Sequence, residues 1–347
     1  MKNSLGIFQS TKGILILLVI VWHTDNLFEV VSGLSFQMNP LIGLLVLLRN
    51  FGIYAGMPAF FMISGYGFRK RPLRIWARFN LIPMIKGYLI AAAIVIGFTA
   101  LKGILLGRDV SKAMISQCIG YALMNHPKAE FFGQEVKGIN VMWFVCTLAI
   151  ASVMLNQILT VKNRRIQIAI CIVLACTGVL LRDIRLPFCI HQSFICCSFM
   201  YIGYYMRQEK LLTKKLPWYF AALPVLLCLF ASLTNDLVLK IARNVYPNGL
   251  LDLMISWIAG IVAMFFFARL DQFNGKIMDA FRWVGQYSFI IYCTHHVERQ
   301  IVPWVRIVSP VIHSAPLQFA AIYILRVLLC LTAAYVFTRY KKRLLRM

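Results

Sequence analysis

Residues 12–23 read Lys-Gly-Ile-Leu-Ile-Leu-Leu-Val-Ile-Val-Trp-His, so ten apolar or small residues separate a cation from a histidine. An α-helix turns 100° per residue, so eleven steps end within about 20° of the starting face, about 16 Å along the axis. With Lys12 at the edge of a bilayer core about 30 Å thick, His23 lies near the middle of the core. An ionisable group is costly at that depth and usually faces a functional cavity. The stretch therefore predicts a membrane helix that carries chemistry.

The composition of the whole chain supports a membrane location. Of the 347 residues, 60% are hydrophobic and 14% are charged, whereas soluble domains carry about 25% charge. In lipid, helices satisfy their own backbone groups, and about 20 residues span the bilayer. We predict an all-α fold, a polytopic transmembrane helical bundle that forms a single domain over 1–347. Its ten expected spans are 12–32, 46–68, 81–101, 140–160, 166–182, 187–206, 217–235, 250–270, 284–304 and 317–338.

The formal charge of +24 follows membrane topology rather than nucleic-acid binding. If both termini are cytoplasmic, 22 of the 36 Lys and Arg residues fall in inside segments and 12 in outside segments. Five of those 12 lie in the long extracytoplasmic loop 102–138. This asymmetry is the positive-inside pattern, and the basic segments are suited to anionic lipid headgroups. We expect a multi-pass protein of the inner (plasma) membrane that binds no nucleic acid.

The cysteines and histidines do not indicate a metal site. The ten cysteines are scattered, mostly inside predicted spans, where a thiol behaves as a small apolar group. Cys118 and Cys189 are the one pair that we consider for a disulfide. The six histidines have no ligand spacing with cysteine or carboxylate. We therefore predict no metal.

Polar and small residues end the second predicted span. Phe60-Phe61 leads into Ser64-Gly65-Tyr66, and a basic run follows whose arginines are Arg69, Arg71, Arg74 and Arg78. The run has two interpretations, a positive-inside loop or a phosphate clamp, because arginine binds phosphate in a bidentate manner. The small residues allow helices or a ligand to approach closely, and they are Gly52, Gly56, Ser64 and Gly65.

A second polar group lies in the ninth predicted span, between Gly285 and Glu298. Tyr292 and His295 are three residues apart and are therefore neighbours on a helix. A histidine within a span is more often functional than structural. We expect His296 and Glu298 to reach the outer interface. Trp143 in the fourth span, taken alone, is typical of packing or of the interfacial aromatic belt.

Five of these motifs, in this order over residues 8–296, resemble the integral-membrane acyltransferase family 3, whose members O-acylate cell-surface sugars. They are Lys12 to His23, Phe60 to Tyr66, the arginine-rich stretch 69–78 with Pro83, Trp143-Phe144, and Gly285 to His295. The chain departs from the family pattern at Lys12, where arginine is frequent, and at Gln9, which replaces an acidic residue. The spacing of its arginine pair is also irregular.

The resemblance implies an O-acetyltransferase that moves an acyl group, acetyl by default, from cytoplasmic acetyl-CoA to a sugar hydroxyl. The acceptor would be a surface polysaccharide or a lipid-linked glycan. His23 would be the general base, with Lys12 beside it in the catalytic group. An acyl-histidine intermediate is the rival mechanism. The implied donor-binding and substrate-binding residues are Arg69, Arg71, Arg74, Arg78, Ser64, Tyr66, Trp143, Tyr292 and His295.

The alternative class of protein is a polytopic transporter or flippase, since polar residues within spans also mark substrate pathways. Two features argue against it. The sequence shows no repeated halves, and its ionisable span residues gather in the first three spans and the ninth.

Overall fold

The computed structural model describes residues 8–24, 40–124, 129–131, 134–184, 186–234 and 239–344. These are helical apart from one antiparallel hairpin, β1 (Ala129–Phe131) with β2 (Gln134–Val136). Each of the ten predicted spans overlaps a helix. Four helical stretches in the described part are long and apolar enough to cross a membrane, at 73–106, 140–158, 250–270 and 316–340. The all-helical fold is thus confirmed and is consistent with a helical membrane protein, while ten spans and cytoplasmic termini remain predictions.

The chain forms two compact units, each described here by itself. The first comprises Met1–Gly33, Gly87–Asp109 and Leu270–Met347, and the second comprises Leu34–Lys86 and Val110–Arg269. Helices of the first unit are α1 (Gln9–Trp22), most of α5 (Ile82–Leu106), α12 (Lys276–Gln286), α13 (Ser288–Ile301), α14 (Trp304–Val308) and α15 (Ala315–Leu344).

The second unit holds the hairpin and the remaining helices. The α-helices are α3 (Pro40–Gly67), α4 (Leu73–Trp76), α6 (Ser111–Ala122), α7 (Trp143–Ile158), α8 (Arg164–Leu180), α9 (Ile190–Gln208), α10 (Trp218–Thr234) and α11 (Leu250–Leu270). Short non-α turns are the π-helix η1 (Ala77–Leu81) and the 3₁₀ turns η2 (Asn140–Met142), η3 (Leu211–Thr213) and η4 (Ile241–Arg243).

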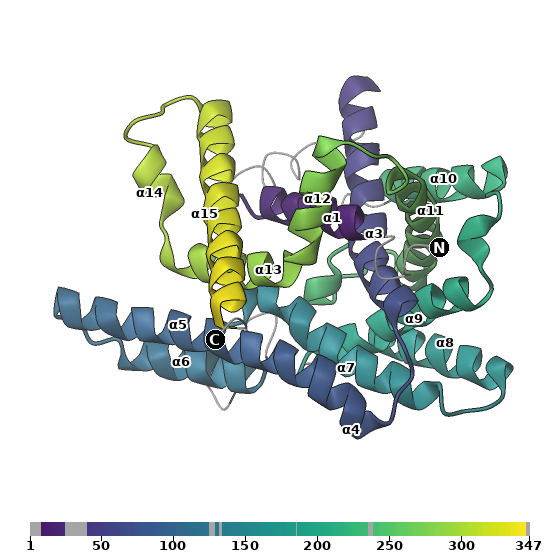
Figure 1. The fold of residues 1–347 in the computed structure, drawn as a ribbon, viewed down its shortest axis with the longest axis horizontal. Helices are drawn as coiled ribbons and strands as arrows, with labels where there is room; N and C mark the ends of the chain where they lie inside the picture. The colour runs from purple at the N-terminus through teal and green to yellow at the C-terminus, as the bar shows by residue number, and fades with distance from the viewer. Residues whose placement is uncertain are drawn as a thin grey trace. The chain divides into compact units, whose positions relative to one another are not determined.

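In the first unit, α1 packs directly against α12 (Figure 1). Two glycines make this contact possible. A Cβ atom on Gly13 would collide with the carbonyl of Phe281, and one on Gly285 would collide with the carbonyl of Gln9. Glycine lets two helix backbones touch where any side chain would separate them. The contact fixes α1, whose C-terminal end leads into His23.

The predicted ninth span is interrupted. Helix α12 ends at Gln286, and α13 begins at Ser288. Between them Tyr287 has φ −106° and ψ 13°, outside the helical region. The chain can therefore change direction within this apolar segment, and the new helix α13 packs against α15 (Figure 1). The buried residues of α13 are Ile291, Tyr292, His295, His296 and Glu298.

In the second unit, α9 packs against α3, α7 and α8. A Cβ on Gly65 of α3 would collide with the carbonyl of Met200, and one on Gly203 of α9 would collide with the carbonyl of Met62. The predicted close approach is therefore confirmed at Gly65. At Gly52 and Gly56 a Cβ would meet no described atom within 4 Å, so neither mediates a helix contact in the described part.

Within the long loop 102–138, residues 115–124 have apolar side chains at helical spacing, and most of them lie in helix α6, which begins at Ser111. The N–H of Lys137 donates to Ser116 Oγ over 2.9 Å, which joins α6 to the segment after β2. The sequence His126-Pro127, which is typical of a helix end, lies outside the described residues. All ten cysteines are free thiols. Cys118 is exposed, whereas Cys189 is buried with its Sγ 3.1 Å from the Met124 carbonyl, so these two form no disulfide.

Replacing Gly13 with Ala should push α1 away from α12, because the new methyl group meets a backbone carbonyl that cannot turn aside. Overpacking of this kind costs about 1–3 kcal/mol, so we expect a lower Tm for the variant in detergent and reduced activity. Gly97→Ala on α5 is the matched control, since a Cβ there meets nothing within 4 Å. Equal Tm values for the two variants would contradict the glycine contact.

Candidate active site

His23 follows the last residue of α1, and its backbone N–H bonds to the carbonyls of Val19 and Ile20, each over 3.2 Å. Its imidazole Nδ1 lies 2.9 Å from Nη1 of Arg299 on α13. A guanidinium group only donates hydrogen bonds, so Nδ1 is the acceptor. A neutral imidazole has one N–H, and this contact therefore assigns the ring hydrogen of His23 to Nε2. The side chain of His23 is partly exposed.

His295 lies beside His23, with the two ring centroids 5.6 Å apart and the ring planes inclined by 31°. It is fully buried, and its Nδ1 lies 2.8 Å from Glu298 Oε1, one helical turn further along α13. An ionised carboxylate only accepts hydrogen bonds, so Nδ1 carries the hydrogen and Nε2 the lone pair. That Nε2 is buried and has no hydrogen-bond partner among the residues that the structure describes.

Glu298 holds these groups together. Its Oε1 accepts from His295, and its Oε2 accepts from the Trp304 indole N–H and lies 3.6 Å from Nε of Arg326. Arg326 also donates from Nη1 to the backbone carbonyl of His23. Glu298 and Arg326 are each 2% exposed, and buried charges require a partner. We call His23, His295, Glu298, Arg299 and Arg326 the histidine cluster.

The other predicted residues of this unit lie on α1 and α13. Lys12 is half-buried on α1, the helix that leads into His23, as the spacing predicts. Tyr292 is buried on α13, one turn before His295. The expectation that His296 and Glu298 reach the outer interface is wrong, since their exposed fractions are 0% and 2%. The physical reason is that α13 starts anew after Tyr287 and packs against α15.

Sequence reasoning missed three members of the histidine cluster. No role was assigned to Arg299 from the sequence, and Glu298 was expected at the interface. Arg326 lies within the predicted span 317–338, and no role was assigned to it either. An intramembrane charge is by default a functional-site hypothesis, so Arg326 did carry a signal. The identity of its partner Glu298 carried no such signal, because the ion pair joins α13 and α15 and no local sequence pattern relates the two helices.

Trp143, Ser64 and Tyr66 lie in the second unit. Trp143 opens α7 and is buried with its ring 6.4 Å from Phe61, which matches the packing interpretation. Ser64 Oγ donates to the carbonyl of Phe60 over 3.0 Å. The carbonyl of Tyr66 accepts from Arg207 over 2.8 Å. These contacts fix the end of α3 just before the basic run.

Two of the predicted arginines precede α4, the third lies in α4 and the fourth lies in η1, and all four side chains are exposed. Asn156 of α7 anchors the backbone there, since its Nδ2 donates to the carbonyl of Arg71 over 3.1 Å. Lys70 Nζ donates to the Leu159 carbonyl over 2.9 Å. An anchored backbone with accessible guanidinium groups fits either a phosphate clamp or a topological loop. The four arginines are Arg69, Arg71, Arg74 and Arg78.

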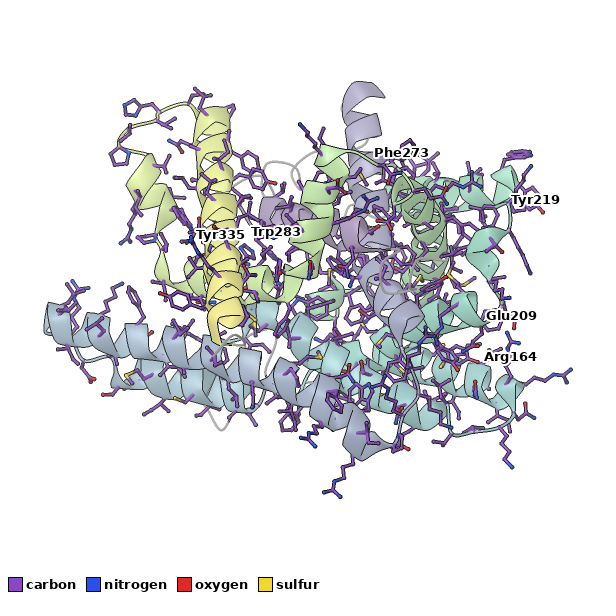
Figure 2. All side chains as sticks on the ribbon, in the orientation of Figure 1. Arg164, Glu209, Tyr219, Phe273, Trp283 and Tyr335 are labelled. Carbon is purple, nitrogen blue, oxygen red and sulfur yellow. The ribbon has the colours of Figure 1, made fainter. Side chains whose placement is uncertain are left out.

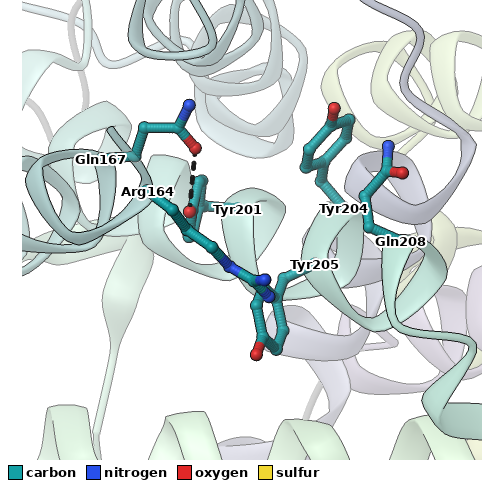
Figure 3. Close-up of a pocket in the computed structure, with 6 residues that line it drawn as sticks. All are labelled: Arg164, Gln167, Tyr201, Tyr204, Tyr205 and Gln208. Carbon is teal, nitrogen blue, oxygen red and sulfur yellow. Dashed lines mark hydrogen bonds between the residues drawn. The ribbon is translucent and has the colours of Figure 1, made fainter. Parts of the chain in front are cut away.

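A cavity of about 210 Å³ in the second unit contains none of the predicted residues. It is lined by Arg164, Gln167, Tyr201, Tyr204, Tyr205 and Gln208 (Figure 3). The Arg164 guanidinium stacks on the Tyr205 ring, 3.9 Å from the ring centroid. It also forms an ion pair with Glu209 over 2.9 Å, and the two residues lie beside each other in Figure 2. The Tyr201 hydroxyl donates to Gln167 over 3.0 Å. Because these groups bind one another, we do not assign the cavity to the active site.

A family model described as an acyltransferase domain matches residues 8–339, almost the whole chain and parts of both units. The chain belongs to the acyltransferase 3 family. Comparisons with curated proteins and with solved structures found no match. Membership confirms the resemblance and makes this chain a membrane acyltransferase. Within the described residues no group of three or more His, Cys, Asp or Glu side chains could hold a metal ion, and the lack of a metal in this acyltransferase remains a prediction.

Arg326→Met should destabilise the acyltransferase, because it leaves Glu298 buried without its cation. Removing one partner of a buried ion pair typically costs about 3–5 kcal/mol, which appears as a lower Tm. The double variant Arg326→Met/Glu298→Gln should recover much of the loss, since neither charge remains. Arg306→Met is the control, because Arg306 is exposed on α14. If Arg306→Met lowers Tm as much as Arg326→Met, the buried pair does not stabilise the fold.

Proposed function

We propose that this acyltransferase moves an acetyl group from cytoplasmic acetyl-CoA to a sugar hydroxyl of a surface polysaccharide or lipid-linked glycan. Family membership supports acyl transfer. The observation that supports the chemistry is the imidazole of His23, whose accepting Nδ1 is held beside the Arg299 cation. We place the protein in the inner (plasma) membrane, where the basic segments of the expected topology would contact anionic lipids.

Transfer from a thioester to a hydroxyl needs a base for the hydroxyl proton and positive charge near the developing oxyanion. In this proposal His23 takes the proton at Nδ1, and Arg299 supplies positive charge. The hydroxyl oxygen forms a bond to the acetyl carbon, the carbon–sulfur bond breaks, and the coenzyme A thiolate takes up a proton. The rival route, through an acetylated histidine, uses the same residue as nucleophile.

Lys12 and the exposed arginines would bind the phosphates of the donor. The arginine fork matches phosphate oxygens in a bidentate manner, and a fixed backbone lowers the entropy lost when the side chains engage. The other proposed binding residues are Ser64, Tyr66, Trp143, Tyr292 and His295. In this assignment the donor enters from the cytoplasm and the acceptor from the opposite side.

Replacing His23 with Ala should lower acetyl transfer by about 10²–10⁴-fold, the usual effect of losing a general base. The measurement is release of free thiol from acetyl-CoA by purified protein with a glycan acceptor, which a transporter would not produce. His313→Ala is the control, because His313 is an exposed loop histidine. A His23→Ala variant that keeps a tenth or more of wild-type turnover would remove His23 from the mechanism.

Arg71→Ala and Arg74→Ala should raise the KM for acetyl-CoA more than they lower kcat, the result expected when uniform binding is lost. Acetyl-pantetheine lacks the adenosine phosphates, so its kinetics should not respond to either change. Arg108→Ala, at an exposed arginine that follows α5, should affect neither donor. Equal losses with both donors would show that the two arginines only set topology.

A further inference from the structure

We propose that His295 and Glu298 form a proton relay behind His23, so that His23 passes its Nε2 proton inward when its Nδ1 takes the proton of the acceptor hydroxyl. This inference rests on the proposed function, and it gives His295 a proton-transfer role in place of the binding role named for it above. It follows from three observations: the hydrogen-bond partners of the two rings, their different burial, and the charge placed next to the inner ring.

The hydrogen-bond partners give the two histidines complementary states. Arg299 donates to His23 Nδ1, which leaves a hydrogen on His23 Nε2. Glu298 accepts from His295 Nδ1, which leaves a lone pair on His295 Nε2. A donor and an acceptor therefore belong to neighbouring rings whose centroids are 5.6 Å apart. At this separation of the rings, a proton would pass from His23 Nε2 to His295 Nε2 through one bridging water molecule, a route that general acid–base catalysis allows.

The two rings differ in exposure, and this difference gives them different roles. His23 is partly exposed, whereas His295 is fully buried. A substrate hydroxyl therefore meets His23 first. The lone pair on His295 Nε2 has no partner in the described part of the chain, and leaving a buried acceptor unsatisfied is costly. A proton accepted from His23 would satisfy the lone pair on this buried nitrogen.

Glu298 stabilises the cation that the relay forms. When His295 accepts a second proton, the new positive charge lies beside the Glu298 carboxylate, whose Oε1 is 2.8 Å from His295 Nδ1, and the two opposite charges attract each other. Other charged or titratable groups near His295 are His23 on α1, His296 and Arg299 on α13, and Arg326 on α15. Glu298 is therefore the positioning residue, and Arg326 keeps it in place.

The proton path is balanced. The hydroxyl proton moves to His23 Nδ1 as Arg299 releases that nitrogen, and the proton on His23 Nε2 moves to His295 Nε2. After the carbon–sulfur bond breaks, His295 returns its proton to His23 Nε2, and His23 Nδ1 gives its proton to the coenzyme A sulfur. Both rings then have their starting tautomers, and the hydroxyl proton has been transferred to the thiol.

The test compares Glu298→Gln and His295→Gln with the matched control Asp279→Asn, which alters an exposed carboxylate on α12. We expect each cluster variant to lower kcat by about 10²-fold or more and to leave the KM for acetyl-CoA unchanged. We also expect Glu298→Gln to shift the pH dependence of kcat, because the charge that stabilises the His295 cation is gone. Asp279→Asn should behave as wild type.

The double variant Glu298→Gln/Arg326→Met separates the relay from folding. It should regain thermal stability relative to Arg326→Met while its kcat remains low. Wild-type kcat in folded His295→Gln or Glu298→Gln would overturn the relay, as would a loss of kcat with an unchanged pH profile. The proposed function fails separately, if purified wild-type protein releases no thiol from acetyl-CoA. Loss of activity in His23→Ala alone would retain the function and reject only the relay.

Discussion

The buried pairing of Glu298 with Arg326 sets the geometry on which the candidate active site depends. Two opposite charges in an apolar interior are tolerated only when they stay together and their remaining hydrogen-bonding groups are used. Here Trp304 and His295 donate hydrogen bonds to the Glu298 carboxylate, and Arg326 donates a hydrogen bond to the backbone carbonyl of His23. Side chains from α13 and α15, and the end of α1, are thereby held in one place.

Hydrogen-bond direction then determines what each histidine can do. A guanidinium cannot accept and a carboxylate cannot donate, so Arg299 and Glu298 assign opposite tautomers to two adjacent rings. The close backbone contact of Gly13 and Gly285 supports this arrangement from the other end of α1. The chemistry proposed here therefore depends on packing between helices as much as on the histidines themselves.

Much of the fold could be predicted from local patterns. The spanning length of the apolar blocks predicted helices, and all ten blocks overlap one. The apolar spacing in the loop 102–138 predicted α6. The break at Tyr287 was not predicted, because residues 284–304 are apolar enough to read as one span and contain no proline before the break. Gly52 and Gly56 resemble Gly65 in the sequence, yet only Gly65 meets a neighbouring helix.

The sequence by itself determined that this chain is a helical membrane protein of the acyltransferase 3 family and that His23 and His295 are candidates for its chemistry. Hydrophobic length, charge asymmetry and motif order are properties of the chain, so no tertiary information was needed. Only the tertiary structure decided that the two rings adjoin and that Glu298, Arg299 and Arg326 surround them. Those contacts join residues up to 303 positions apart, and local sequence patterns do not encode which buried charges meet.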